Sequence, residues 1–355
     1  MKPLTTILSA AVATTAAVTV TIGGASPGAA GLDPDAAPTK AASAAAPAPD
    51  IQRPKIPYLR ANRVGFGTGD WRLVRPDGTR QLVGTTTWSD FAVLGRGIVA
   101  SYGTEAGVEV VRVKPNGKTT ITKGLEHYGL VLSPDQQTAG YLDNAERFVS
   151  VENQGRRLVR LIRMSGARTP GAIVTAKAHT CRDAEVVVNG GCTAFVNRRT
   201  DAKAVASHGF SVDVPRLRSV ADVDRRGRVV GTIKAEPKCS GMLVNARRIA
   251  WRTCDHRLES FSPDGRHVLG TKRNSVDRAR SVAIYDTAGV MTASWNWGRA
   301  LVTDVQWEDD GHLLAVQYLD GAWSMVRLGL DGSSELVVGP LNGVVDYPKL
   351  KLPLR

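Results

Sequence analysis

The chain has 355 residues, a formal net charge of +13 and four cysteines. Its apolar content, 43%, is ordinary for a protein with a packed core, and the length allows one large domain or two. No cysteine precedes Cys181, which excludes a lipid attached to a processed N-terminal cysteine.

Residues 1–31 are typical of a secretory signal peptide. Lys2 is their only charged residue, a largely apolar run covers residues 7–22, and small residues follow at 25–30, where a signal peptidase could cut. The run is short and weakly apolar for a membrane span, and an uncleaved N-terminal anchor is the alternative. We therefore expect a protein that is extracellular or associated with the cell envelope.

Residues 32–50 consist mostly of Ala and Pro, which predicts a disordered linker that cannot build a core. Residues 1–50 carry a net charge of −1, so the rest of the chain carries +14. We expect residues 51–355 to form the folded domain.

Residues 51–355 contain short alternating strands joined by turns with glycine. Six hairpins surround turn glycines that follow one another at steps of 39 to 62 residues, namely Gly78, Gly117, Gly166, Gly227, Gly289 and Gly332. Each gap has room for two further strands, and no stretch has the pattern of a long amphipathic helix. Repeated units of four short strands predict an all-β fold, a β-propeller of four-stranded antiparallel blades. The hairpins favour six blades, and the two longest steps leave room for a seventh.

A propeller must close its ring because unpaired strand edges invite association with other chains. We expect a strand from one terminus to close it, with residues 57–59 and residues 344–347 as the candidates.

A second hairpin recurs three times. It is clearest at residues 258–270, where Pro263-Asp264-Gly265 supplies the turn, and weaker copies lie at residues 132–141 and 307–316. With the following Ala283-Ile284-Tyr285-Asp286, the stretch resembles the WD40-like repeat of TolB-type propellers over about one blade. The Gly-His and Trp-Asp pairs of true WD40 repeats do not recur. The resemblance implies a propeller that binds other molecules, and it transfers no catalytic residue because the shared motif is a turn.

The four cysteines most simply form two disulfides in a secreted chain, Cys181–Cys192 and Cys239–Cys254, although three connectivities are allowed. The rival interpretation is a metal site that also uses His179 and His256. Separations of 11 and 15 residues do not fit the close cysteine pairs of zinc sites, which favours the disulfides.

No motif in the sequence predicts catalysis or a cofactor. Gly24-Ala25-Ser26-Pro27-Gly28 matches the letters of a nucleophile elbow, but without the strand and helix that the elbow requires. Asp255-His256 could be half of an acid–base pair, but no nucleophile lies near it in the sequence. Phosphate-binding and calcium-binding loops are absent from the sequence. We therefore expect no catalytic residue, no cofactor and no metal.

Trp295 and Trp297 fall on one face of a strand because side chains alternate. They could form a stacking platform for a sugar or peptide, but packing between blades is the favoured interpretation.

The excess of basic residues lies in short clusters, and the candidate basic surface consists of Arg225, Arg226, Arg228, Arg247 and Arg248. Basic residues that converge on one face would attract a polyanion, such as a cell-wall polymer or nucleic acid. A distributed, solvated surface is the favoured alternative.

These observations lead to one main hypothesis and two alternatives. The main one is a secreted or envelope-associated, non-enzymatic β-propeller, a monomer that is a scaffold for another protein, a cell-envelope component or another ligand. The alternatives are a propeller hydrolase or lyase with residues from several blades, and polyanion binding through a basic surface.

Overall fold

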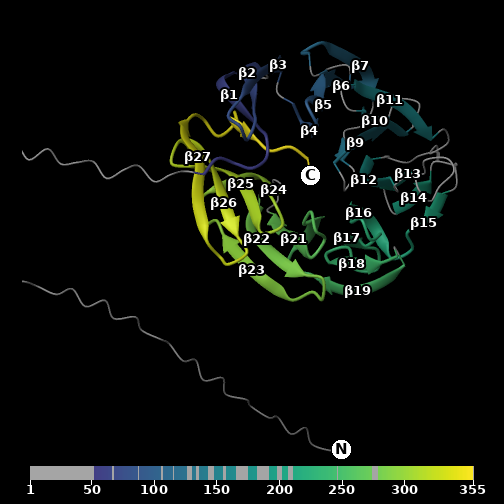
Figure 1. Ribbon diagram of the computed structural model, residues 1–355. Coiled ribbons are helices and arrows are strands. Elements are labelled where there is room, and N and C mark those ends of the chain that lie inside the picture. Colours follow the sequence, from purple (N-terminus) through teal and green to yellow (C-terminus); the bar gives the residue numbers. More distant parts are fainter. Residues whose placement is uncertain are drawn as a thin grey trace, which may run out of the picture. The chain divides into compact units, whose positions relative to one another are not determined.

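Strands alone make up the regular structure in this computed structural model, within the residues that it describes (Figure 1). Those residues are 52–354 except 66–67, 87, 105–106, 115, 126–129, 133–135, 143–147, 155–156, 165–174, 182–191, 198–201, 207–210, 246 and 274–278. They belong to one of the two compact units into which the chain divides, residues 50–355. The predicted signal peptide and linker lie outside the described residues. No described helix is long and apolar enough to cross a membrane.

The described strands form seven groups of four, each of them antiparallel, and the first five groups are separate sheets. The first is β28 (Leu350–Lys351), β1 (Tyr58–Gly65), β2 (Thr68–Val74) and β3 (Arg80–Thr86). The second is β4 (Asp90–Leu94), β5 (Gly97–Thr104), β6 (Gly107–Val113) and β7 (Thr119–Leu125). The third is β8 (Val131–Leu132), β9 (Thr138–Leu142), β10 (Phe148–Gln154) and β11 (Arg157–Met164). The fourth is β12 (Thr175–Cys181), β13 (Cys192–Asn197), β14 (Ala202–Ala206) and β15 (Ser211–Asp213).

The last three groups follow in chain order. The fifth is β16 (Leu217–Val223), β17 (Val229–Ile233), β18 (Ser240–Val244) and β19 (Arg248–Thr253). The sixth is β20 (Arg257–Phe261), β21 (His267–Arg273), β22 (Ala279–Asp286) and β23 (Met291–Asn296). The seventh is β24 (Leu301–Trp307), β25 (His312–Leu319), β26 (Ala322–Gly329) and β27 (Ser334–Asn342). The sixth and seventh groups are joined into one eight-stranded sheet by a single residue pair, Ala279 with Val302.

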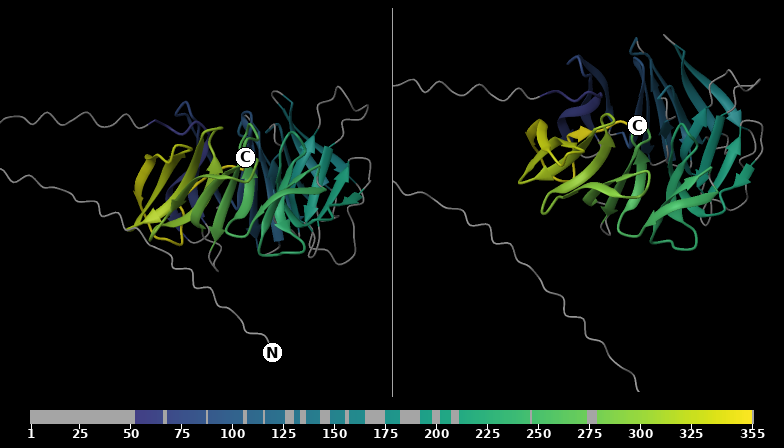
Figure 2. Two further views of the ribbon diagram at one scale, coloured as in Figure 1. Left: turned by 90° about the horizontal axis from the view of Figure 1, so that it is seen from below. Right: turned by 60° about the horizontal axis from the view of Figure 1, so that its bottom comes forward.

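The seven groups stand around a central axis as the blades of a propeller, with the first strand of each blade near the centre and the fourth at the outside (Figures 1 and 2). The predicted all-β propeller with four-stranded antiparallel blades is therefore confirmed. The favoured number of six blades is corrected to seven, the alternative that the long steps allowed. The count of glycine turns failed because such a turn can join any two strands of a blade. Gly78 lies between β2 and β3, which are the third and fourth strands of the first blade. Gly227 lies between β16 and β17, which are the first and second strands of the fifth blade.

The ring closes where β28 pairs with β1, through Leu59 with Lys351 and Arg60 with Leu350. The N-terminal candidate for closure is thus confirmed, and the C-terminal candidate, residues 344–347, is wrong. These residues form a turn, in which the Val344 carbonyl accepts a hydrogen bond from Trp323 Nε1 at 3.0 Å. The chain then continues beyond β28 toward the centre of the ring, where the Leu354 N–H donates to the Phe91 carbonyl at 2.8 Å (Figure 1).

The core lies between neighbouring blades, because the blades bury apolar side chains against one another. One apolar cluster joins the second and third blades, and another joins the sixth and seventh around the buried Trp307. Strands near the axis are buried along most of their length, as in β4, whereas the outer β19 alternates between exposed and half-buried residues. This difference follows from position, since an outer strand has water on one side.

Candidate functional site

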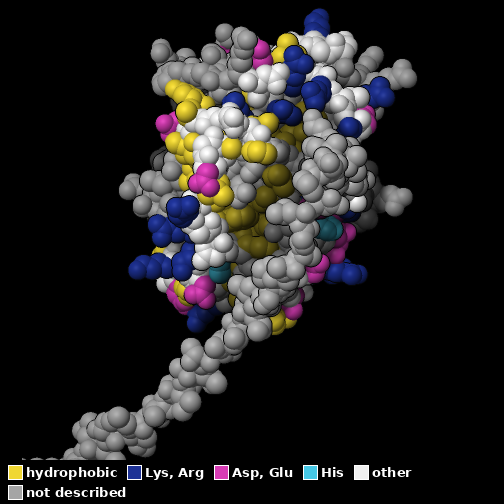
Figure 3. Space-filling view, turned by 90° about the vertical axis from the view of Figure 1, so that its left-hand side faces the viewer, with side chains coloured by type: hydrophobic (Ala, Val, Ile, Leu, Met, Phe, Trp, Pro, Cys, Tyr) yellow, Lys and Arg dark blue, Asp and Glu magenta, His cyan; other side chains and the backbone are white. Residues whose placement is uncertain are grey.

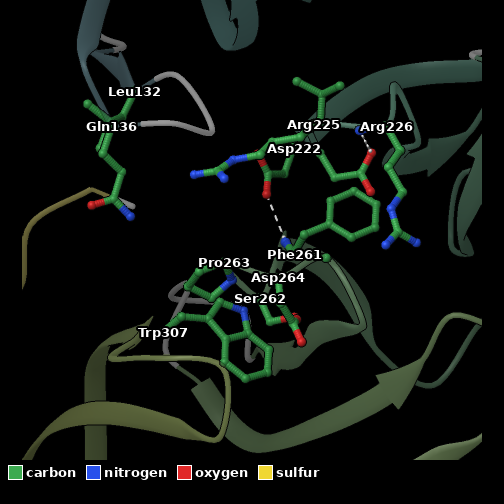
Figure 4. A pocket seen from close by; sticks show the side chains of 13 residues that line it. Leu132, Gln136, Asp222, Arg225, Arg226, Phe261, Ser262, Pro263, Asp264 and Trp307 are labelled. Atoms are coloured by element: carbon green, nitrogen blue, oxygen red, sulfur yellow. Dashed lines mark hydrogen bonds between the residues drawn. The ribbon is translucent and has the colours of Figure 1, made fainter.

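In every blade but the first, the first and second strands follow one another in the chain and are joined at one end of the ring, which we call the first-turn face. A pocket of about 220 Å³ opens there between the turns of the fifth, sixth and seventh blades and that of the third blade. We call it the mouth pocket. It is lined by Leu132, Gln136, residues 222–226, residues 261–265 and Trp307. Figure 4 shows Leu132 and Gln136 across the opening from Asp222 and Phe261, with Trp307 and Pro263 along a third side.

A second pocket of about 460 Å³ shares Leu132 and Gln136 with the mouth pocket and continues it toward the first two blades. Its other walls include Arg75, Asp77 and the C-terminal segment at Leu354. The first-turn face thus has a broad, interrupted hollow rather than a single narrow hole.

The position of Asp222 depends on an irregularity in β16. The pairing of β16 with β17 shifts its register between Val220 and Asp222. Such bulges change the direction of a side chain at the end of a strand. The Asp222 carboxylate reaches the next blade, where its Oδ2 accepts a hydrogen bond from the Phe261 N–H at 2.8 Å (Figure 4). Its Oδ1 accepts from the Val223 N–H, also at 2.8 Å.

Burial raises the pKa of the Asp222 carboxyl to about 7, and the nearby charge of Asp224 adds to the increase. The hydrogen bonds from the Phe261 and Val223 N–H groups oppose it, because they stabilise the charged form. Asp222 therefore changes its charge near neutral pH, at the wall of the mouth pocket.

Asp224 organises the turn that follows. Its Oδ1 accepts hydrogen bonds from the N–H groups of Arg226 and Arg228, at 3.0 and 2.7 Å. Its Oδ2 pairs with the Arg228 guanidinium, with Nη2 at 2.6 Å, and both side chains are largely buried. Arg228 also donates to the Gly265 carbonyl of the next blade and lies 5.6 Å from the centre of the Phe261 ring.

The turn of the sixth blade is held in a similar way. Ser262 Oγ donates to Asp264 Oδ1 at 2.7 Å and accepts from the His267 N–H at 2.9 Å. Asp264 in turn donates its own N–H to Asp310 Oδ1 in the seventh blade, at 2.8 Å. The first turns of the fifth, sixth and seventh blades therefore form one hydrogen-bonded chain across the blade boundaries.

The N-terminal segment extends this chain. The Lys55 N–H donates to Glu308 Oε1 at 2.5 Å, and Lys55 Nζ contacts Asp309 Oδ2 at 2.6 Å. Burial would raise the pKa of Asp309, but hydrogen bonds from Lys55, the Gly311 N–H and His312 outweigh it and lower this pKa to about 2. Asp309 is therefore charged at neutral pH and has a structural role.

The five arginines of the predicted basic surface do not share one environment. Arg225 and Arg226 are exposed and line the mouth pocket, and Figure 4 shows the Arg225 side chain extending over the opening. Arg228 is engaged by Asp224. Arg247 and Arg248 are exposed at the turn between β18 and β19, at the same end of the fifth blade but outside the pocket lining. Two of the five thus lie at the pocket.

The Cys239–Cys254 disulfide is present and joins the flanks of β18 and β19, with the two Cα atoms 4.0 Å apart. The metal interpretation is wrong for this pair, because its sulfurs are bonded to each other. His256 instead hydrogen-bonds the Tyr285 hydroxyl, at 2.8 Å. The backbone places Cys181 directly opposite Cys192 in the pairing of β12 with β13. Their side chains lie outside the described part of the structure, so the second disulfide stays a prediction.

Trp295 and Trp297 are half-buried and pack against the apolar cluster between the sixth and seventh blades. The favoured interpretation, packing between blades, is consistent with this position of both rings.

The sequence did not reveal Asp222, Phe261 and Trp307 as pocket residues. The sequence indicated only a structural turn at Pro263-Asp264-Gly265, and the structure places these three residues in the lining of the mouth pocket. The recurrence of this turn in several blades was the available signal, since equivalent turns gather at one end of a ring.

No protein-family model matches the chain, and no curated protein matches its sequence. Among solved structures, that of U3-55K is similar with a TM-score of 0.51 and 10% identity, over 81% of this chain and 86% of that one. The crystal structure of the RRP9 WD40 repeats has a TM-score of 0.50 and 10% identity, over the same shares of the two chains. At this identity the likeness concerns the fold alone. Together with the blades of the described residues, it defines the fold as a β-propeller similar to that of WD40 repeats.

Proposed function

We propose that the protein is a secreted or envelope-associated, non-enzymatic propeller of the TolB type that binds a segment of another protein at the mouth pocket. The observation that carries this proposal is the composition of the pocket. Four blades contribute to it, with apolar surface from Phe261, Pro263 and Trp307 beside charged Arg225 and Arg226. Ligand sites combine apolar walls with a few placed polar groups in this way.

The chemistry of the walls defines the partner. An apolar side chain of the partner would fill the hollow beside Pro263 and Trp307, and acidic groups next to it would face Arg225 and Arg226. Protein interfaces have an apolar centre and a polar rim, and arginine is enriched in them. We therefore infer a segment with a Leu or Phe flanked by Asp or Glu.

Secretion is supported by the signal-like residues 1–31, followed by the linker 32–50, and by the Cys239–Cys254 disulfide. Disulfides persist in oxidising compartments and are rare in the cytosol. The TolB-type assignment is supported by the Ser-Pro-Asp-Gly turn at residues 262–265, and we propose that the protein is a monomer.

Polyanion binding is the second candidate, favoured by the net charge of +14 on residues 51–355. On the side of the molecule seen in Figure 3, however, basic side chains gather near both ends together with acidic ones, and apolar side chains lie between them. Mixed signs of this kind weaken the attraction for a polyanion.

The hydrolase or lyase alternative has one specific observation in its favour, the pKa of Asp222 near 7 at the pocket wall. General acids and bases work best with a pKa near the operating pH. Asp224 and Asp264, the other carboxylates of the pocket, are engaged in holding their turns. An Asp222→Asn variant that loses turnover of a defined substrate would favour the enzyme over the binding scaffold.

Two charge-reversal variants test the proposal against polyanion binding. Arg225→Glu with Arg226→Glu changes the pocket, and Arg247→Glu with Arg248→Glu makes the same change of charge at the same end of the same blade. Binding is measured by fluorescence anisotropy, with a peptide library that presents Leu or Phe between acidic residues and with a DNA oligonucleotide.

The proposal predicts that only the pocket variant loses peptide binding, by about tenfold or more for two contacts that are each worth roughly 1 kcal/mol. If both variants lose binding affinity equally, and if binding depends steeply on salt and favours DNA over the peptides, the protein binds polyanions instead. If no peptide of the library binds the wild-type protein, the proposal fails.

A further inference from the structure

A second pocket with a different character lies at the opposite end of the sixth and seventh blades. It has a volume of about 570 Å³, and its walls come from the end of β21, the start of β22, the end of β23 and the start of β24. We call it the basic pocket, because three of its residues are Lys272, Arg280 and Arg299. It shares no lining residue with the mouth pocket.

Strand register explains why polar groups gather in it. Lys272 pairs with Ser281 across β21 and β22, and Ser281 pairs with Asn296 across β22 and β23. Residues directly opposite one another in antiparallel strands point to the same face of a sheet. Lys272, Ser281 and Asn296 therefore form one row, and Arg280 and Arg299 stand beside it.

The charge of the basic pocket is not balanced by its own walls. Lys272, Arg280 and Arg299 are all exposed, and none of them forms an ion pair within the described residues, which leave out 274–278. The described lining contains no acidic residue. Asn296 Oδ1 accepts from the Gly298 N–H at 3.1 Å, an arrangement that leaves the amide nitrogen of Asn296 as a donor.

His256 lies behind the wall of the basic pocket and contacts one of its residues, Ser281. Its Nδ1 lies 2.8 Å from the Tyr285 hydroxyl, and its Nε2 lies 3.4 Å from Ser281 Oγ in the wall of the basic pocket. Burial is the main cause of the lowered pKa of His256, and the positive charge of Lys272 lowers this pKa further. The negative charge of Asp255 acts in the opposite direction. The field of Lys272 thus reaches the imidazole through the pocket wall.

From this arrangement we propose that the basic pocket binds phosphate groups. Two guanidinium groups, one ammonium group, a hydroxyl and an amide are all donors, and guanidinium groups match the oxygens of a phosphate with paired hydrogen bonds. The volume exceeds the need of a single phosphate and lies in the range of sites for small molecules, so it accommodates a phosphodiester chain as well as a free ion.

Two triple variants test the proposal in the full chain. Lys272→Gln, Arg280→Gln and Arg299→Gln remove the three cations of the pocket. The control replaces Lys234, Lys238 and Arg216 with Gln, which removes the same charge from exposed positions outside the pocket. The probes are inorganic phosphate and a synthetic glycerol-phosphate oligomer, and affinity is measured by titration calorimetry at several salt concentrations.

We expect the pocket variant to lose at least about tenfold in affinity, with a salt slope smaller by roughly one unit for each lost contact, and the control to change little. Saturation by phosphate alone identifies a small-anion site, and binding of the oligomer alone identifies a polymer site. Equal losses in both variants, or no binding of either probe to the wild-type protein, would overturn the proposal.

A nuclear magnetic resonance titration of the histidines adds a local readout. A bound phosphate screens Lys272, so the pKa of His256 rises when the basic pocket is filled. Asp255, Lys272 and Tyr285 are the charged or titratable groups that act on His256. An unchanged His256 titration with saturating phosphate would place the bound anion elsewhere and refute the proposed site.

Discussion

Glu308 and Arg327 form an ion pair inside the seventh blade, where their side chains are 0% and 5% exposed. Both carboxylate oxygens take part, with Arg327 Nη2 2.9 Å from Glu308 Oε1 and Arg327 Nε bonded to Oε2. The same guanidinium donates to the Arg53 carbonyl at 3.0 Å, so the pair also anchors the N-terminal segment.

Glu308→Gln should destabilise the protein by about 3–5 kcal/mol, because it leaves the buried Arg327 guanidinium with only the half-exposed Glu335 as a counter-charge. Urea unfolding followed by tryptophan fluorescence measures the loss. The matched control is Glu335→Gln, which removes the other carboxylate of Arg327 at a 51% exposed position and should cost less than about 1 kcal/mol. If both variants lose the same free energy of unfolding, burial does not determine the contribution of the Glu308–Arg327 ion pair to stability.

Replacing Cys239 and Cys254 together by Ser should reduce the free energy of unfolding by about 3 kcal/mol, since the bond closes a loop with a separation of 15 residues. Urea unfolding with and without reductant measures it, and the reductant should leave the stability of a chain without disulfides unchanged. If the double Ser variant still loses stability on reduction, Cys181 and Cys192 form the second predicted bond.

The raised pKa of Asp222 predicts that the free energy of unfolding decreases as the pH rises toward 7. Its pKa in the folded protein is raised to about 7, so between about pH 4 and pH 7 the folded state binds a proton that the unfolded state has lost. The stabilisation that this proton gives to the folded state is fully present below the unfolded-state pKa of Asp222 and is lost as the pH rises through 7. The stability of the wild-type protein relative to Asp222→Asn should therefore be greater at pH 5 than at pH 8. Parallel pH profiles of the two proteins would contradict the assignment.

Removal of residues 350–355 should open the ring and destabilise the protein by several kcal/mol, because it removes the buried side chains of Leu350 and Leu352, at about 2 kcal/mol for each. Thermal unfolding measures the loss. A synthetic peptide of residues 348–355 should restore stability when added in excess, and the same peptide with Leu350→Asp and Leu352→Asp should not. A truncated protein with unchanged stability would show that β28 does not close the ring.

The fold could be predicted from the sequence because its signals are local. Alternating strands and glycine turns such as those at Gly117 and Gly289 depend on neighbouring residues, and the structure places both glycines in hairpin turns with positive φ. The number of blades could not be predicted from local signals, because the sequence of a turn does not show which two strands of a blade it joins. The strand that pairs with β1 at the closure was also missed, since β28 has only two residues and no pattern of its own.

The candidate site was harder to predict, because Leu132, Asp222, Phe261 and Trp307 meet only after the ring has formed. Arg225 and Arg226 were found because a pair of basic residues is visible in the sequence. Arg228 was grouped with them wrongly, since its ion pair with Asp224 depends on the shape of one turn. Asp222 has no sequence signal, because its pKa depends on burial at the boundary between two blades.

The pairing of β1 with β28 has a consequence for synthesis. The ribosome makes β1 among the first strands and β28 last, so nearly the whole domain leaves the exit tunnel while the edge of β1 is unpaired. Exposed edges of this kind pair readily with strands of other molecules. A β28 strand from a second copy fits this edge as well as the chain's own strand does, so a high local concentration of unfinished chains should raise the yield of strand-swapped dimers beside the closed single rings.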